Sequence, residues 1–273
     1  MSPSTLRVVS TTCSNTEILC ALGCADMLVG VDDYSDYPED AVARLPRVGP
    51  DLDVDVSRVK ALAPDLVLAS LTVPGHERVV DALLAAGLRV LAPEPVSLAD
   101  VAADIREIAR AVGVEARGEE VAARFTSALV PRPARGLRPS VLVEWWPKPV
   151  ISPGRFSWVT DLLELAGGRN PLGGEPIKSR PLDVDELRRL DPDAIVISWC
   201  GIDPSKYREE VVLERRGCEN LRAVRGRRVF PIPEAHLGRP GPRLVDGLAD
   251  LARVVAACPH ERRRRLPRRE SRR

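Results

Sequence analysis

Two arginines flank the predicted start of the last amphipathic helix, in the segment Gly238-Arg-Pro-Gly-Pro-Arg243. A guanidinium carries a planar fork of donors that matches carboxylate, amide or phosphate groups, and the N–H groups at a helix start offer further donors. Arg239 and Arg243 are therefore candidate ligand-binding residues. The alternative is that both side chains only cover a solvated helix start.

Aromatic side chains make up only 4% of the chain, and nine of the ten are predicted to lie in or beside loops that follow strands, or in the final strand. The nine are Tyr34, Tyr37, Trp145, Trp146, Phe156, Trp158, Trp199, Tyr207 and Phe230. This clustering predicts contact with a large, flat or apolar ligand. Because consecutive strand residues point to opposite faces, at most one of Trp145 and Trp146 faces the ligand. The candidate contacts are Tyr34, Tyr37, Trp145 and Trp199, with the alternative that single rings only plug the edges of the core.

Thiols and imidazoles on the same predicted loops could supply an axial ligand to a bound metal. They belong to Cys13, Cys200, His76 and His236. No two of them have the spacing of a metal site on one element, so no protein-held metal is predicted, and His76 and His236 are only weak candidates. Cys13 and His236 are also candidate contacts of the ligand.

Sequence motifs of common enzyme classes are absent. The chain has no glycine-rich dinucleotide loop after its first strand, no Walker loop, no nucleophile elbow and no His-Glu-x-x-His. We therefore predict a binding protein without enzymatic activity and without a required cofactor. The competing interpretation is a two-lobed tetrapyrrole metal chelatase or reductase that uses Cys13, Cys200 and His236.

Short apolar runs alternate with helical patterns, which predicts βαβ units around mainly parallel sheets. Strands are predicted near residues 7–11, 28–31, 66–69, 88–92, 140–144, 194–198 and 228–232, and helices near 16–22, 56–62 and 77–85. Ligands of open α/β sheets bind at the carboxyl ends of the strands. Most of the candidate residues above follow these predicted strands directly.

An internal repeat indicates two similar lobes. Residues 54–70 align without gaps on residues 182–198, and each copy reads as a helix that stops at Pro-Asp and is followed by a buried strand ending in Ser. The predicted fold class is α/β, with two similar lobes built on mainly parallel sheets and a ligand cleft between them. The predicted lobes are residues 1–96 and 131–260, joined by a long helical linker over 97–130.

The charge of the chain is nearly balanced, with 40 Lys+Arg against 39 Asp+Glu. Residues 261–273 hold eight arginines and two glutamates, so this segment carries +6 and residues 1–260 carry −5. We predict a disordered basic tail on an acidic body. The acidic body argues against a specific nucleic-acid binder, whose affinity would come from neutralising phosphates.

No run of about 18 apolar residues is present, so the chain is not predicted to span a membrane. A strand-like segment begins at Leu6, which leaves no room for a secretory signal, and the six cysteines are expected to be reduced. As written, the chain is predicted to be cytoplasmic and monomeric. The alternative is a periplasmic location, or anchoring at the outer face of the membrane, for a chain whose leader has been omitted.

Five segments, in order along the chain, resemble the substrate-binding proteins of ATP-driven cobalamin and iron-siderophore importers, and the cobalamin-binding branch is the closer match. They are residues 10–23, 29–38, 63–67, 161–168 and 239–243. Within them, Tyr34-Ser-Asp-Tyr-Pro38 is the most specific pointer to cobalamin. The sequence departs from the family near Cys13-Ser14-Asn15, where a common proline of the first loop is replaced.

The resemblance implies two lobes held by a rather rigid linking helix, with a tetrapyrrole-like ligand between them. A corrinoid is the first expectation, and haem or a ferric siderophore is the alternative. By position, Tyr34 or Tyr37, Trp199, and Arg239 or Arg243 would contact the ligand.

A membrane permease would be the partner protein implied by the resemblance. It would dock on surface carboxylates, namely Glu77 on the first lobe and Glu209 or Glu210 on the second. A cytoplasmic relative would instead serve storage, delivery or sensing of the ligand.

Overall fold

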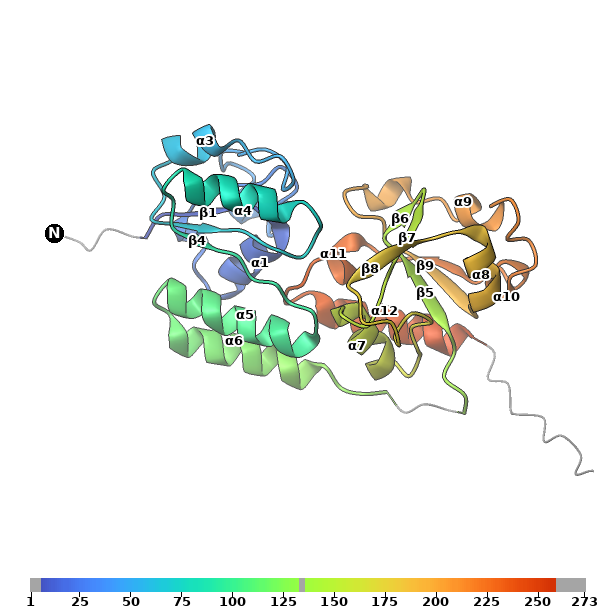
Figure 1. Cartoon of the computed structure of the whole chain (residues 1–273). Coiled ribbons are helices and arrows are strands. Elements are labelled where there is room, and N and C mark those ends of the chain that lie inside the picture. Colours follow the sequence, from blue (N-terminus) through green and yellow to red (C-terminus); the bar gives the residue numbers. More distant parts are fainter. Residues whose placement is uncertain (1–5, 133–135, 259–273) are drawn as a thin grey trace, which may run out of the picture.

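Two α/β lobes lie side by side in the computed structural model, which describes residues 6–132 and 136–258 (Figure 1). The predicted basic tail, residues 261–273, lies outside these described residues. Within the described part of the chain, no helix is both long and apolar enough to cross a bilayer.

A four-stranded parallel sheet, in the order β2-β1-β3-β4, forms the centre of the N-terminal lobe. Its strands are β1 (Val8–Ser10), β2 (Leu28–Val31), β3 (Leu66–Leu68) and β4 (Val90–Leu91), connected through α1 (Cys13–Ala21), η1 (Ala25–Met27), α2 (Glu39–Val42), α3 (Val56–Ala61) and α4 (His76–Ala85). Val8 and Val9 point to opposite faces of the sheet and are both fully buried, as expected for a parallel sheet covered on both sides. The predicted strands of this lobe are confirmed.

The C-terminal lobe combines a parallel and an antiparallel sheet. The parallel strands are β5 (Val141–Glu144), β9 (Ala194–Ile197) and β10 (Val229–Pro231), as predicted, in the order β10-β9-β5. The antiparallel strands β6 (Trp146–Pro147), β7 (Val150–Pro153) and β8 (Ser179–Leu182) are not predicted by the sequence. Each of these strands is short and contains a proline, and a proline in a short segment indicates a turn more than a strand. The helices and helical turns of this lobe are α7 (Trp158–Leu165), α8 (Val184–Leu190), η2 (Pro204–Lys206), α9 (Glu210–Leu213), α10 (Arg222–Arg225), α11 (Glu234–Leu237) and α12 (Leu244–Ala257).

The sequence repeat corresponds to a structural repeat of one helix and one strand. Asp55 caps α3 and Asp183 caps α8 through their side chains. The residues before the repeated prolines, Ala63 and Asp191, both have positive φ (44° and 36°), so each helix ends in the same left-handed turn. The aspartates after these prolines also match: Asp65 accepts from the N–H of Arg7, and Asp193 from that of Ser140, each at 2.8 Å. The prediction of two similar lobes is confirmed, because both contain this helix–strand unit.

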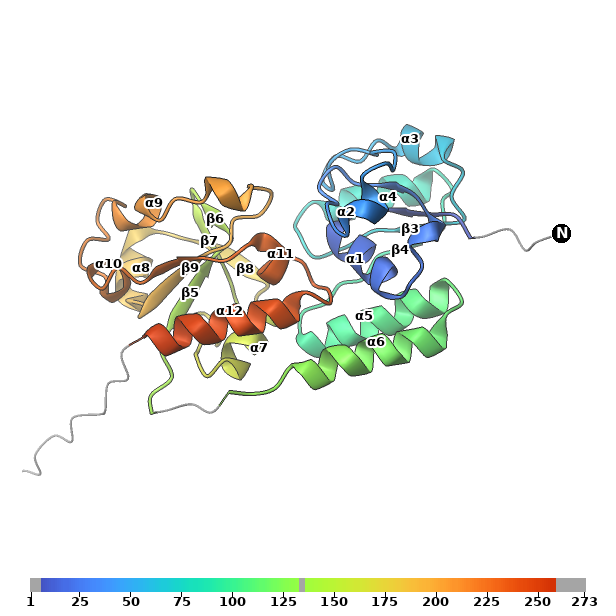
Figure 2. The same ribbon diagram turned by 180° about the vertical axis from the view of Figure 1, so that it is seen from behind.

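The segment between the lobes is a helical hairpin and not one long linking helix. Helices α5 (Leu98–Ala111) and α6 (Glu115–Ala128) run antiparallel and lie together beneath the N-terminal lobe (Figures 1 and 2). The chain reverses at Gly113, whose φ of 80° is readily adopted by glycine. The predicted start at Ser97 is confirmed, because its side chain accepts from the N–H of Asp100. The contact with the second lobe is made at this end of α5, where the N–H of Leu98 donates to Asp161 at 3.0 Å.

A buried carboxyl on α5 gives a first testable prediction. Asp104 is 9% exposed, and burial, followed by the nearby charges of Glu107 and Asp100, raises its pKa to about 7. The folded chain therefore holds this proton more tightly than the unfolded chain, and stability falls as pH rises from about 4 through 7. We expect Asp104→Asn to be more stable than the wild type by about 1–2 kcal/mol at pH 8, after allowing for partial solvation of the carboxylate.

Urea unfolding of both proteins at pH 4 and pH 8 checks this expectation. The advantage of Asp104→Asn should be much larger at pH 8, because only there does the wild type bury a charged carboxylate. An equal difference at the two pH values would contradict the assignment.

Candidate ligand-binding site

A group of polar and aromatic side chains joins the two lobes at the carboxyl ends of their strands. We call it the interlobe cluster; it consists of Cys13, Glu17, Asp36 and Tyr37 from the N-terminal lobe and Glu234, Arg239 and Arg243 from the C-terminal lobe. Cys13 and Glu17 lie on α1, which follows β1, whereas Asp36 and Tyr37 lie in the loop after β2. Glu234 begins α11, which follows β10. The cluster therefore occupies the position where α/β sheets bind their ligands.

Arg239 lies at the centre of the interlobe cluster and is 8% exposed. Its Nη1 lies 3.2 Å from Glu17 Oε1 and 2.5 Å from Asp36 Oδ1, and its Nη2 lies 3.6 Å from Glu234 Oε2. Two of these three carboxylates belong to the other lobe. The predicted ligand-binding arginine is thus a charged contact between the lobes.

Glu17 is the buried partner of Arg239 in α1. It is 4% exposed, and burial raises its pKa although the charges of Arg239 and Arg243 lower it. Its Oε2 and the Nε of Arg239 are buried and have no hydrogen-bond partner within the described residues. Unsatisfied polar atoms of this kind are costly, so the centre of the cluster holds one acceptor and one donor whose hydrogen-bonding capacity is unused.

The guanidinium of Arg243 stacks on the face of the Tyr37 ring. The guanidinium carbon lies 4.5 Å from the ring centroid, and Nη1 of Arg243 lies 3.4 Å from Glu17 Oε1. Tyr37 is 48% exposed and Tyr34, on the same loop, is 45% exposed. These rings therefore offer exposed aromatic surface next to the charged part of the cluster.

The loop that carries both tyrosines is fixed by Asp32, which follows β2 and is fully buried. Asp32 accepts from the N–H of Tyr34 at 2.9 Å and from the hydroxyl of Ser35 at 2.5 Å. Arg47 donates to the carbonyls of Asp32 and Ser35 from the other side. This network holds Tyr34 and Tyr37 in place without using their side chains.

Burial raises the pKa of both predicted cleft thiols. Cys13 lies at the start of α1 and donates to Asp32 Oδ2 at 3.6 Å, and burial followed by the charge of Asp32 raises its pKa well above the usual value. Burial raises the pKa of Cys200 to about 12. A thiol must lose its proton to act as a nucleophile or to ligate a metal. The raised pKa values make the reactive thiolate form of both cysteines scarcer at neutral pH.

Trp199 does not line the site, contrary to the prediction. Its side chain is 3% exposed and packs edge-on against Tyr207 inside the C-terminal lobe, with ring centroids 5.4 Å apart. The hydroxyl of Tyr207 donates to the carbonyl of Trp199 and fixes this arrangement. Trp145 is partly buried and packs against Trp158, with centroids 6.1 Å apart. The alternative of aromatic rings that fill the core holds for Trp199.

The two candidate histidines, His76 and His236, have acidic partners outside the interlobe cluster. His236 Nδ1 lies 2.7 Å from Asp250 of α12, and His76 Nε2 lies 3.3 Å from Asp51. Among the residues that the structure describes, no group of three or more His, Cys, Asp or Glu side chains could hold a metal ion.

Several site residues were missed by the sequence analysis, chiefly Glu17, Asp36 and Glu234. Glu17 follows three polar residues of α1, Ser14, Asn15 and Thr16, so its residue type gave no signal that it is buried. Lys178, which directly precedes β8, was missed as well; it donates to the carbonyl of Leu71 at 3.0 Å and to Glu94 at 2.5 Å. It forms a second charged contact between the lobes.

The carboxylates predicted to dock a permease lie on different lobes. Glu77 is exposed in the first turn of α4, where it accepts from the N–H of Gly75 at 2.9 Å. Glu210 is the exposed first residue of α9, and Glu209 precedes it and is partly exposed.

Comparison with known proteins gives consistent matches along the chain. Residues 8–235 match the family described as periplasmic binding protein. The ABC transporter substrate-binding lipoprotein YvrC of Bacillus subtilis (strain 168) is 29% identical over 258 residues, which cover 91% of this chain and 79% of that protein. The vitamin B12-binding protein of Yersinia pestis (strain Pestoides F) is 28% identical over 195 residues, which cover 70% of this chain and 69% of that protein.

Among solved structures, the periplasmic heme-binding protein RhuT from Roseiflexus sp. RS-1 superposes with a TM-score of 0.76. It is 27% identical in sequence, and the match covers 92% of this chain and 98% of that one. The similarity extends over both lobes.

Proposed function

We propose that this chain, which belongs to the periplasmic binding protein family, binds a corrinoid at the interlobe cluster as the substrate-binding component of an ABC importer. The similarity to a vitamin B12-binding protein and to an ABC transporter lipoprotein supports this proposal. No other bound group is required, and the ligand is released unchanged. The observation that carries the choice of ligand is the charge of the cluster.

Carboxylates outnumber guanidiniums at the site. Glu17, Asp36 and Glu234 surround Arg239, and its two terminal nitrogens already contact all three. A carboxylate of a ligand would have to displace one of them and would meet the repulsion of the others. Haem carries two carboxylates on its edge, so this environment opposes it.

A corrinoid suits the same environment better. Its edge carries neutral amides, which can donate to carboxylates and accept from guanidiniums, and its cobalt centre is positive. The unpartnered atoms of Glu17 and Arg239 match the acceptor and donor sides of an amide. The exposed rings of Tyr34 and Tyr37 add flat apolar surface for the macrocycle.

Haem remains the second candidate because of one specific observation. The solved structure of RhuT, similar over both lobes, is a heme-binding protein, and its identity to this chain is close to that of the B12-binding relative. A ferric siderophore is a further alternative within the same class. These candidates differ in charge, so their relative affinities separate them.

We place the protein at the outer face of the membrane or in the periplasm, in preference to the cytoplasm. One relative is named a lipoprotein and the RhuT structure is named periplasmic, which supports this alternative. In that location Glu77 of one lobe and Glu209 or Glu210 of the other would contact the permease. Salt bridges to arginines of the permease are the expected contacts.

Absorbance titration with cobalamin tests the proposed function. We expect the wild type to bind with a Kd below about 10 μM. Tyr37→Phe keeps the ring over which Arg243 lies and should bind as the wild type does, whereas Tyr37→Ala removes it and should weaken binding about tenfold. If the wild type fails to bind below about 10 μM, the corrinoid proposal is wrong; if Tyr37→Ala binds like the wild type, the site is misplaced.

A further inference from the structure

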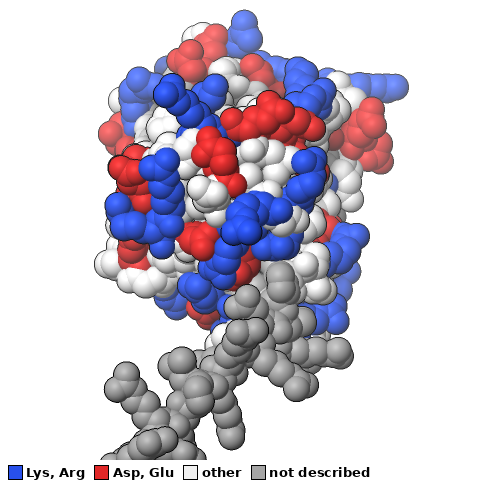
Figure 3. All heavy atoms as spheres, turned by 90° about the vertical axis from the view of Figure 1, so that its right-hand side faces the viewer, with Lys and Arg blue, Asp and Glu red and all other residues white. Residues whose placement is uncertain are grey.

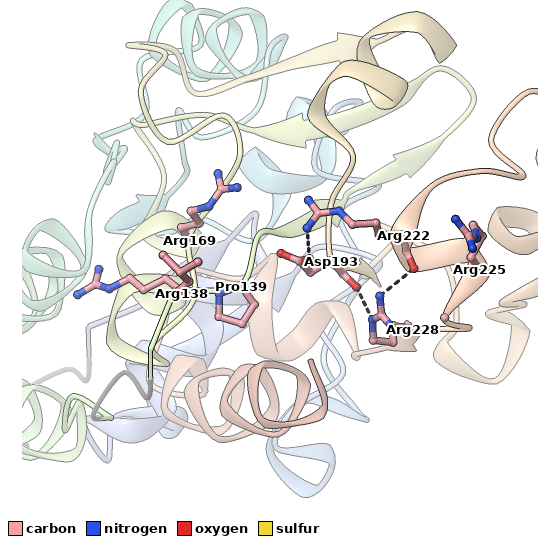
Figure 4. Close-up of a pocket in the computed structure, with 9 residues that line it drawn as sticks. Arg138, Pro139, Arg169, Asp193, Arg222, Arg225 and Arg228 are labelled. Carbon is pink, nitrogen blue, oxygen red and sulfur yellow. Dashed lines mark hydrogen bonds and ion pairs between the residues drawn. The ribbon is translucent and has the colours of Figure 1, made fainter. Parts of the chain in front are cut away.

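A second site lies at the opposite end of the C-terminal lobe from the interlobe cluster. A pocket of about 450 Å³ opens at the amino ends of β5, β9 and β10, whereas the interlobe cluster lies at the carboxyl ends (Figure 4). Its lining residues are Leu137, Arg138, Pro139, Arg169, Asp193, Arg222, Arg225, Gly226 and Arg228. Its volume is that of a small-molecule site.

The pocket holds five arginines and one aspartate. Elsewhere on this end of the molecule, basic and acidic side chains are interspersed (Figure 3). The carboxylate of Asp193 is already paired: its Oδ1 lies 2.5 Å from Nη1 of Arg222, and its Oδ2 accepts a hydrogen bond from the N–H of Ser140. Asp191 also contacts Arg222, so two carboxylates face the five guanidiniums and the pocket carries a surplus of about three positive charges, an arrangement that a bound polyanion would stabilise.

Two of the arginines are held firmly and so are oriented before any ligand binds. Arg222 contacts Asp191 at 2.8 Å as well as Asp193, and Arg228 donates to the carbonyls of Asp193 and Arg222. Asp193 belongs to the internal repeat, so its position is fixed by the fold itself.

The other three arginines are free to reach a ligand. The side chains of Arg138, Arg169 and Arg225 make no hydrogen bond or ion pair with another described residue. Arg138 and Arg169 stand on one side of Asp193, and Arg225 on the other (Figure 4). Guanidinium groups therefore line the pocket on both sides of Asp193, and arginines carry the paired donors that suit phosphate oxygens.

We propose that this pocket binds a small, multiply charged phosphate compound that contains a di- or triphosphate group. The volume, the surplus of about three positive charges and the guanidinium donors together favour two or three linked phosphates over a single one. This site is separate from the proposed corrinoid site and does not depend on it.

Calorimetric titration of the full chain with inorganic pyrophosphate and with inorganic triphosphate tests the proposal. We compare the wild type with the double variant Arg138→Gln/Arg169→Gln, whose side chains make no internal contact that folding would need. The matched control is Arg44→Gln/Arg124→Gln, which removes two exposed arginines from the N-terminal lobe and α6. All three proteins keep residues 261–273, so any binding by that segment is the same in each.

We expect one saturable site for pyrophosphate or triphosphate, weakened at least about tenfold in the pocket variant and unchanged in the control. Equal affinities in the two double variants would overturn the proposal, because binding would then reflect general charge. Binding to vesicles of phosphatidylglycerol without binding to either soluble anion would also overturn it, in favour of a membrane surface as the ligand.

Discussion

Replacing Arg239 with alanine is expected to lower the free energy of unfolding by about 2–3 kcal/mol. The reason is that Glu17, 4% exposed, would lose its main positive partner and remain buried. Breaking a buried ion pair typically costs about 3–5 kcal/mol. The expected loss is smaller here because Arg243 stays 3.4 Å from Glu17 and because the carboxyl can take up a proton.

The pH dependence of this variant follows from the same argument. Burial already raises the pKa of Glu17, and removal of Arg239 raises it further. A carboxyl with a raised pKa is neutral at low pH and costs stability as pH rises through that pKa. Arg239→Ala should therefore be destabilised more at pH 8 than at pH 5.

Denaturant unfolding at both pH values checks the effect, and Glu17→Gln/Arg239→Ala is the control. The double variant leaves no buried carboxylate without a partner, so it should recover part of the loss and its pH dependence should shrink. A double variant that is less stable than Arg239→Ala at pH 8 would show that Glu17 and Arg239 are not coupled.

Replacing Glu144 with alanine is expected to cost about 3–5 kcal/mol of stability. Glu144 is fully buried at the end of β5, and burial raises its pKa against the opposing effect of Arg215. The two carboxylate oxygens lie 2.6 and 2.9 Å from the terminal nitrogens of Arg215. Without Glu144, that guanidinium, 13% exposed, would be left buried and unpaired.

The control for this prediction is an ion pair on the surface of the same lobe. Arg188 and Asp185 lie 2.9 Å apart, but their side chains are 55% and 74% exposed. Asp185→Ala should therefore change the free energy of unfolding by only about 0–1 kcal/mol. If the two alanine variants unfold at the same denaturant concentration, the buried pair of Glu144 and Arg215 does not contribute the expected free energy of unfolding.

The fold was largely predictable from the sequence because its signals are local. The repeat of a capped helix, Pro-Asp and an apolar strand fixed the two similar lobes, and the same capping aspartates appear in both copies of the structure. The helical segment between the lobes was predicted, but helical periodicity does not show that the chain reverses at Gly113 and forms the hairpin of α5 and α6. The antiparallel strands β6 to β8 were missed because each is short and contains a proline, and because β7 pairs with β8 about 30 residues further along the chain.

The site was predictable only in part, for a related reason. Arg239, Arg243 and Tyr37 were found because their types and positions after strands suggested ligand contacts, and the structure brings them together. Glu17 and Asp36 carry no such signal, since a single carboxylate in a helix or loop usually faces solvent. Their importance comes from the approach of the other lobe, more than 200 residues away in the sequence. Trp199 shows the opposite error, because position after a strand did not reveal that its ring turns into the core.

The charge of the interlobe cluster predicts which ligand the protein prefers. The most direct test is the ratio of the Kd values for cobalamin and haem, measured on the same purified protein in the same buffer. We expect cobalamin to bind more tightly by at least about tenfold, or about 1.4 kcal/mol, because its amides suit a site where carboxylates outnumber guanidiniums. Tighter binding of haem than of cobalamin would contradict it.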